Sequence, residues 1–123
     1  MLIDGNISDS NGTRGIIVTR GTTLSAFPPI ISLAGVTNNR ANDNVDDGIL
    51  IASIIPGSGA TPVSGNRTDR NGVDGIDINS TGYVVSNNTA LRNTVDGINA
   101  VGNVNGGGNK ATQNASCNTP GCF

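Results

Sequence analysis

A recurring frame of asparagine and glycine is the sequence feature that most constrains the fold. The clearest copy runs from Asn66 through Asn71 to Gly75 and is followed by an apolar run at 76–78. Three other places repeat this order of Asn, four residues, Asn, three residues, Gly and an apolar run, while a fifth copy lacks the glycine. Five copies in one register indicate a repeat protein rather than a disordered chain rich in Gly and Asn. The copies begin at Asn6, Asn39, Asn66, Asn88 and Asn109.

The repeat length and the apolar pattern together predict a solenoid. Successive copies begin 33, 27, 22 and 21 residues apart, which is the length of one solenoid coil with insertions. Ile49 and Ile51 should point inward and Leu50 outward, because side chains alternate along a strand. Short strands separated by Asn and Gly corners would pair in parallel with the next copy about 4.8 Å away. We predict an all-β parallel β-helix of four full coils and a partial fifth over residues 1–114. The expected outward column is Ile17, Leu50, Asp77 and Asn99.

The copies differ in length along a single arc. This arc covers 19–35 in the first copy, 52–62 in the second, 79–84 in the third and 101–103 in the fourth. We expect loops on one flank of the solenoid. The longest loop either covers exposed strand surface, which we favour, or forms the wall of a ligand site.

Charge and hydropathy exclude some classes of partner. The 123 residues carry a net charge of −2, which is too small to indicate binding of nucleic acid. No apolar run approaches the roughly 20 residues that span a bilayer. No signal peptide precedes the first copy, so we expect either a cytoplasmic protein or, preferably, a fragment of a longer one.

The tail at 115–123 leaves the repeat frame and contains both cysteines. Cys117 and Cys122 flank a Pro-Gly pair, and a disulfide between them could close a small loop over the last coil. A metal site would need more ligands, and the chain has no histidine. We therefore predict a disulfide-capped tail and an extracellular, cell-surface or periplasmic location.

The repeats resemble a known family. The openings VSGN, VSNN and VTNN, the strands DDGILI, VDGIDI and VDGINA, and the tail GNKATQNASCNTPGC are similar to right-handed parallel β-helix repeat proteins. These proteins belong to the pectin-lyase-like superfamily, with pectate lyases, periplasmic NosD-type proteins and alginate epimerases. The resemblance implies a right-handed helix. It identifies the scaffold rather than an activity.

One column of asparagines should stack at a corner of the coil. Asparagine amides can bond from coil to coil, and asparagine tolerates the left-handed backbone that sharp corners need. We predict a structural ladder of Asn11, Asn44, Asn71, Asn93 and Asn114.

The candidate chemistry is acidic. Asp47, Asp74 and Asp96 precede the frame glycines and should form a column of like charges. Three interpretations stay open: solvated carboxylates bonded to local backbone N–H groups, a face that binds Ca²⁺ or sugar, and catalysis. The resemblance implies Ca²⁺ held by acidic residues and a basic residue that removes a proton from a uronic acid. No motif fixes that base, so we assign no catalytic residue. The further candidates for ligand binding are Arg40, Arg67, Asp77 and Asn99.

Three functions compete at this point. We favour a non-catalytic extracellular β-solenoid module that is structural, self-assembling head to tail through its N-terminal coil, or weakly carbohydrate-binding. The alternative is the C-terminal part of a polysaccharide lyase or epimerase that acts on uronic-acid polymers. A phage or surface adhesin fragment is the third.

The tail generates a first prediction. The intact mass of the protein should be two hydrogens lighter without reductant than with it, because Cys117 and Cys122 are joined. Reduction should lower the free energy of unfolding by about 2 kcal/mol, as expected for a short closed loop. Denaturant melts with and without reductant measure this. A Cys117→Ser, Cys122→Ser double variant should not respond to reductant, and an unchanged mass of the parent protein would refute the pairing.

Overall fold

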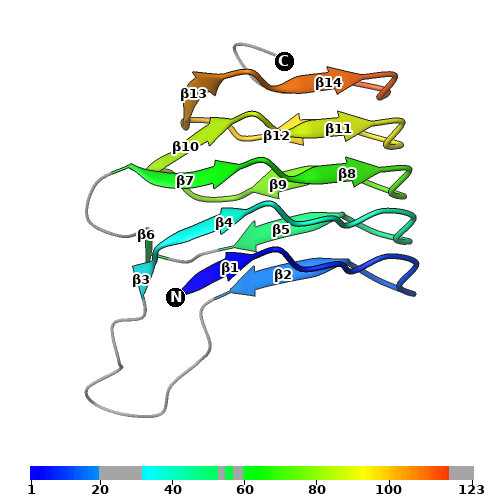
Figure 1. Ribbon diagram of the computed structural model, residues 1–123. Helices are drawn as coiled ribbons and strands as arrows, with labels where there is room; N and C mark the ends of the chain where they lie inside the picture. The colour runs from blue at the N-terminus through cyan, green and yellow to red at the C-terminus, as the bar shows by residue number, and fades with distance from the viewer. Residues whose placement is uncertain (20–31, 53–54, 57–59, 117–123) are drawn as a thin grey trace.

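The computed structural model describes residues 1–19, 32–52, 55–56 and 60–116, and these residues form strands and turns without a helix. The strands lie in layers, one coil above another, with the first and last coils at opposite ends of the stack (Figure 1). No helix in the described part of the chain could cross a membrane. We number the coils 1 to 5 by their first frame residues, Asn6, Asn39, Asn66, Asn88 and Asn109.

Three parallel sheets form the walls of the solenoid, as the repeat predicted. The first contains β1 (Leu2–Asp4), β4 (Gly35–Thr37), β7 (Thr61–Ser64), β10 (Tyr83–Ser86) and β13 (Val104–Gly107). The second contains β8 (Arg67–Asp69), β11 (Thr89–Leu91) and β14 (Lys110–Thr112). The third contains β2 (Ile16–Thr19), β5 (Ile49–Ala52), β9 (Ile76–Ile78) and β12 (Ile98–Asn99). A small fourth sheet pairs β3 (Ser32–Leu33) with β6 (Ile55–Pro56), both from the variable arc.

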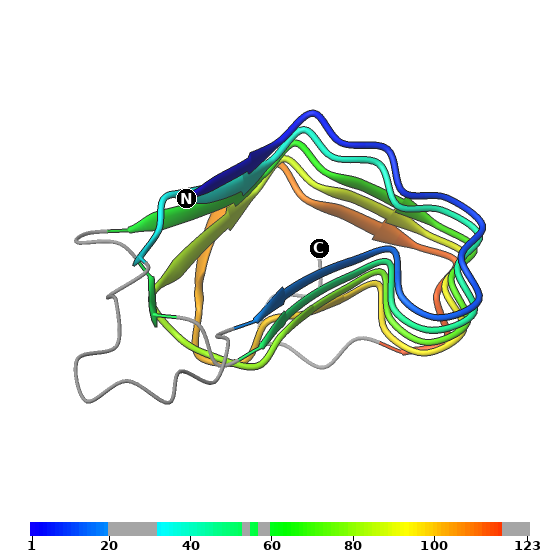
Figure 2. The same cartoon turned by 90° about the horizontal axis from the view of Figure 1, so that it is seen from below.

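The solenoid is right-handed. Seen from below, the chain runs clockwise from β1 toward β2 while successive coils recede from the viewer (Figure 2). Parallel strands joined by a crossover almost always take this hand, because strand twist favours it. The fold class predicted from the repeat is confirmed, and the hand is the one that the resemblance implied.

The strand register places the frame residues in columns. Ile16 pairs with Ile49, Ile49 with Ile76 and Ile76 with Ile98, so one isoleucine lies above another through four coils. Three of these isoleucines are fully buried, and Ile16 packs at the edge of the core. The outward column is also confirmed, since Ile17 is exposed and its partners are partly exposed. The core is Val18, Leu33, Val36, Ala41, Ile49, Ile51, Val63, Ile76, Ile78, Tyr83, Val85, Ala90, Ile98 and Ala100.

The predicted asparagine ladder is present at the second corner of the coil. Asn71 is 1% exposed, and its Oδ1 accepts bonds from the backbone N and the Nδ2 of Asn44, both at 3.0 Å. Its Nδ2 donates to Asn93 Oδ1 at 2.9 Å and to the Ala41 carbonyl at 3.0 Å. Each interior amide thus makes four bonds, which offsets the cost of burying it. The ladder runs through Asn11, Asn44, Asn71, Asn93 and Asn114.

A second ladder follows the first asparagine of the frame. Asn66 accepts from the N and Nδ2 of Asn39 and donates to Asn88 Oδ1 and to the Val36 carbonyl. The repeat predicted this column, but we expected no ladder from it. The repeated Asn at this position was the available signal. Its members are Asn6, Asn39, Asn66, Asn88 and Asn109.

The prediction that ladder asparagines would adopt the left-handed backbone is wrong. The residue before each ladder asparagine takes that conformation instead, for example Arg70 at φ 54° and Arg92 at φ 54°. The backbone N–H and the side chain of the ladder residue both bond to the next coil, as Asn71 N and Nδ2 do to Asn93 Oδ1. The left-handed residues at the second corner are Ser10, Asp43, Arg70, Arg92 and Gln113.

The frame glycines are required by close approach of the next coil. A Cβ on Gly75 would lie 2.5 Å from the Gly97 carbonyl oxygen and 2.7 Å from Asn93 Nδ2. The same crowding occurs at Gly48, whose Cβ would meet the Gly75 carbonyl oxygen at 2.6 Å. Any side chain here would push the ladder apart. Glycine is therefore part of the ladder geometry.

Two expectations lie outside the described residues. The disulfide between Cys117 and Cys122 and the fold of 20–31 within the longest arc remain predictions.

The ladder generates a second prediction. Asn71→Ala should lower the free energy of unfolding by at least about 3 kcal/mol, because it leaves two donors of Asn44 and the Ala41 carbonyl unpaired in the interior. Asn79→Ala is the matched control, since Asn79 is exposed and its side chain makes one exposed bond to Asp77. Urea melts followed by circular dichroism measure both. Similar losses for the two variants would contradict the ladder's role.

Candidate functional site

The acidic column lies at the turn that leads into the third sheet. Asp47, Asp74 and Asp96 precede the frame glycines of coils 2, 3 and 4 and are 4%, 6% and 1% exposed. The expectation that these carboxylates are solvated is therefore wrong, whereas the expected bonds to backbone N–H groups are present for Asp47 and Asp74. The tight glycine turn places each carboxylate beneath the next coil.

Each carboxylate in the column bonds to the coil above it. Asp74 N donates to Asp47 Oδ1 at 3.3 Å, and Asp96 N donates to Asp74 Oδ1 at 2.8 Å. At the top, the hydroxyl of Ser116 donates to Asp96 Oδ1 at 2.6 Å. The carboxylates thus act as acceptors for backbone groups between coils.

An arginine closes the lower end of the column. Arg14 stands at the equivalent position in coil 1, and its Nε donates to Asp47 Oδ2 at 2.8 Å. Its Nη2 lies 3.0 Å from Asp46 Oδ2. These partners raise the pKa of Arg14, chiefly through the bond to Asp47. Arg14 was not among the predicted site residues, although it occupies the same frame position as the three aspartates.

The interior of the acidic column favours the protonated, neutral form of Asp74. Burial raises the pKa of Asp74 to about 6, the bond from Asp96 N opposes this, and the charges of Asp77, Asp96 and Asp47 raise it further. Burial is also the main reason why the pKa of Asp77 is raised. Asp74 therefore gains a proton more readily in the folded chain than in the unfolded chain.

The column does not gather ligands around one point. Across residues 1–19, 32–52, 55–56 and 60–116, no three His, Cys, Asp or Glu side chains are grouped so that they could hold a metal ion. The suggestion of Ca²⁺ at Asp47, Asp74 and Asp96 thus finds no support in this geometry.

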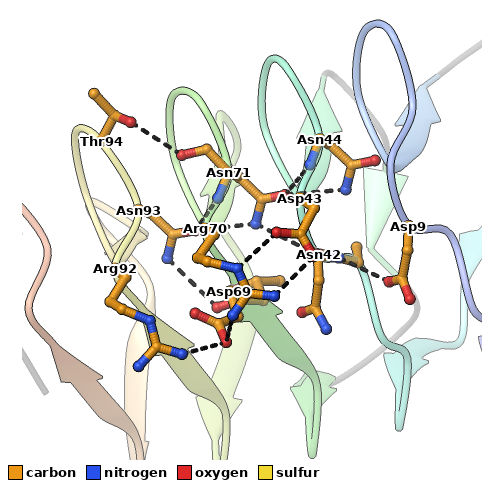
Figure 3. A network of polar contacts seen from close by, with 12 residues as sticks. Asp9, Asn42, Asp43, Asn44, Asp69, Arg70, Asn71, Arg92, Asn93 and Thr94 are labelled. Atoms are coloured by element: carbon orange, nitrogen blue, oxygen red, sulfur yellow. Dashed lines mark hydrogen bonds and ion pairs between the residues drawn. The ribbon is translucent and has the colours of Figure 1, made fainter.

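A network of ion pairs lies near the second corner (Figure 3). Arg70 binds Asp43 through two bonds of 2.7 and 2.8 Å and Asp69 through one of 2.9 Å. Arg92, one coil higher, donates to the same Asp69 oxygen at 2.6 Å. Asp69 is only 1% exposed, so this network holds a buried carboxylate with arginines from two coils. Asp69 was not among the predicted site residues.

The predicted ligand-binding residues separate onto two walls. Arg40 and Arg67 face each other in register near the second sheet, and Arg40 donates to Asp9 Oδ2 at 2.9 Å. Asp77 and Asn99 are paired in the third sheet, where Asn99 Nδ2 donates to Asp77 Oδ1 at 3.1 Å. The structure therefore brings each pair together but does not unite the four in one site.

A surface hollow adjoins the outward column. Its volume is about 310 Å³, close to the lower limit for sites that bind small molecules. Its lining residues include two with side-chain amides and two with hydroxyls. It is lined by Ile78, Asn79, Ser80, Thr81, Asn99 and Val101.

Comparison of the chain with models of protein families, with curated proteins and with solved structures found no match.

The acidic column generates a third prediction. Because the pKa of Asp74 is about 6 when folded and 3.8 in the reference state, the folded chain binds this proton more tightly. The contribution of Asp74 to stability should fall as pH rises from about 4 to 6, by about 3 kcal/mol at most. Asp74→Asn should flatten the dependence of unfolding free energy on pH between 4.5 and 7.

Asp4→Asn is the control for that measurement. Bonds from Thr37 and Asn38 lower the pKa of Asp4, so this group is ionised in both states above about pH 5 and adds no slope there. Urea melts at several pH values measure both variants. A slope that persists unchanged in Asp74→Asn would refute the assignment.

Proposed function

We propose that this chain is a non-catalytic, extracellular β-solenoid module of the pectin-lyase-like type, with a structural role and weak affinity for carbohydrate. The observation that carries the proposal is that the buried asparagine and aspartate side chains are bonded to other residues of the solenoid. Both ladders and the acidic column direct their hydrogen bonds to neighbouring coils, and the buried Asp69 is bonded by arginines of its own coil and the next. Such an arrangement favours a rigid scaffold over a reacting centre.

The distribution of charge supports a non-catalytic role. General acid–base chemistry needs a titratable group within reach of a bound substrate. Asp74 has the raised pKa that such a group would need, but it is 6% exposed and already accepts a bond from Asp96 N. The exposed arginines Arg40 and Arg70 are paired with Asp9 and Asp43.

The hollow beside β9 and β12 supports weak binding of sugar. Amide and hydroxyl groups of Asn79, Thr81 and Asn99 can exchange hydrogen bonds with sugar hydroxyls, and Val101 adds an apolar edge. No aromatic residue lines the hollow, so stacking on a sugar ring would be lacking. We therefore expect low affinity.

This proposal generates a fourth prediction. Titration of oligosaccharides by NMR should give dissociation constants near 1 mM for the best ligand. Asn99→Ala combined with Thr81→Ala should weaken this binding at least about threefold, because both polar groups are removed. Thr112→Ala, an exposed change on the second sheet, is the control.

The same experiment includes uronic-acid polymers with Ca²⁺. We expect no cleavage. Depolymerisation that depends on Ca²⁺ would instead support a lyase or epimerase, and binding that is unaffected by the double variant would move the sugar site elsewhere.

A further inference from the structure

The two ends of each asparagine ladder carry opposite hydrogen-bonding groups. In coils 2 to 5, every ladder Oδ1 accepts bonds from the coil below. In coil 1, the Oδ1 atoms of Asn6 and Asn11 receive no bond from any residue that the structure describes. The lower end of the stack thus presents two amide acceptors.

The upper end presents donors. The backbone N–H of a ladder residue in coils 1 to 4 always bonds to the Oδ1 above it, as Asn93 N does to Asn114 Oδ1 at 2.8 Å. Within residues 60–116, the N–H groups of Asn109 and Asn114 have no such acceptor. Asn114 Nδ2 makes one bond, to the Ala90 carbonyl, and keeps a second hydrogen.

Backbone groups at the two edges are complementary as well. Arg40 N donates downward to the Asn6 carbonyl, and Asp46 N donates downward to the Thr13 carbonyl. The equivalent groups of coil 1 are Ile7 N and Thr13 N, and no described residue lies below to accept from them. At the other end, the carbonyls of Asn109 and Ser116 occupy the positions of the missing acceptors.

The shapes of the two edges also match. The arcs 6–13 and 109–116 have the same length, and each has asparagine at its first and sixth positions. Their corners have the same backbone, with Ser10 at φ 58° and Gln113 at φ 61°. Coil 5 of one copy can therefore meet coil 1 of another with the register that coil 4 and coil 5 already have.

We propose that a second copy of this chain stacks on the first, with arc 109–116 of one copy beneath arc 6–13 of the next. The contact extends the ladder that ends at Asn114 through its backbone N–H and its Nδ2, and the ladder that ends at Asn109 through its backbone N–H, because Asn109 Nδ2 already bonds to Val85 and Asn105. The parallel strands also continue across the junction, as strand addition does at an exposed sheet edge. Because the two surfaces differ, the association is head to tail and does not close on itself. This inference rests on the proposed structural role and names its partner.

Proline substitutions on the lower edge test the stacking. Ile7→Pro and Thr13→Pro each remove one downward N–H and add a ring at the contact. Both side chains are exposed and neither residue has a left-handed φ, so the coil itself should tolerate proline. Ile7→Ala and Thr13→Ala are the matched controls, because they shorten the same side chains and keep the N–H.

Sedimentation velocity over a wide range of protein concentration, with negative-stain microscopy, measures the association. The parent chain and both alanine variants should form end-to-end oligomers that grow with concentration. Each proline variant should raise the dissociation constant at least about tenfold while keeping the parent's circular dichroism spectrum and melting temperature. If one proline variant fails to fold, the dissociation constant of the other variant tests the stacking.

Two results would overturn the stacking. The first is a parent chain that stays monomeric at every concentration, and the second is a folded proline variant that assembles like the parent. Either result would leave the proposed carbohydrate-binding module standing, because that function is measured by the sugar titration.

Discussion

Hydrogen bonding of asparagine side chains along the solenoid axis is the interaction on which the rest of this structure depends. A buried primary amide is costly unless its two donors and its acceptor are all satisfied. Asn71 meets this requirement only because identical residues stand directly above and below it. The amide therefore fixes the height of each coil and the register of the strands beside it. The left-handed residue before it and the glycine four residues later follow from the same geometry.

The buried charged residues are also bonded along the solenoid axis. Asp74 accepts from the backbone of Asp96, and Asp69 is held by arginines of its own coil and the next. Such groups are expensive to bury, and their partners here come from the same coil or from a neighbouring one. A chain with few aromatic residues can thus build an interior from short apolar columns and satisfied polar ladders. Among the residues that the structure describes, the hollow beside Asn99 is a place where a small ligand could lie.

Parts of the candidate site could be predicted from the sequence. The column of Asp47, Asp74 and Asp96 follows from the repeat, because equal frame positions stack. Its burial could not be predicted, since that depends on how tightly the glycine turn tucks each carboxylate under the next coil. The place of Arg14 in this column could have been predicted in the same way. The ion pairs of Asp69 could not be predicted, because they join long side chains whose directions depend on the corner backbone.

The sequence by itself determined the parallel β-helix, the number of coils, the inward and outward columns and one asparagine ladder. These features follow from spacing, because a repeat in register places like residues above one another. Only the tertiary structure decided which wall each column occupies, and it separated Arg40 and Arg67 from Asp77 and Asn99. It also decided which polar groups are buried and which ladder ends stay unpaired. The physical reason is that burial and partner choice depend on distances between coils, which a linear pattern does not contain.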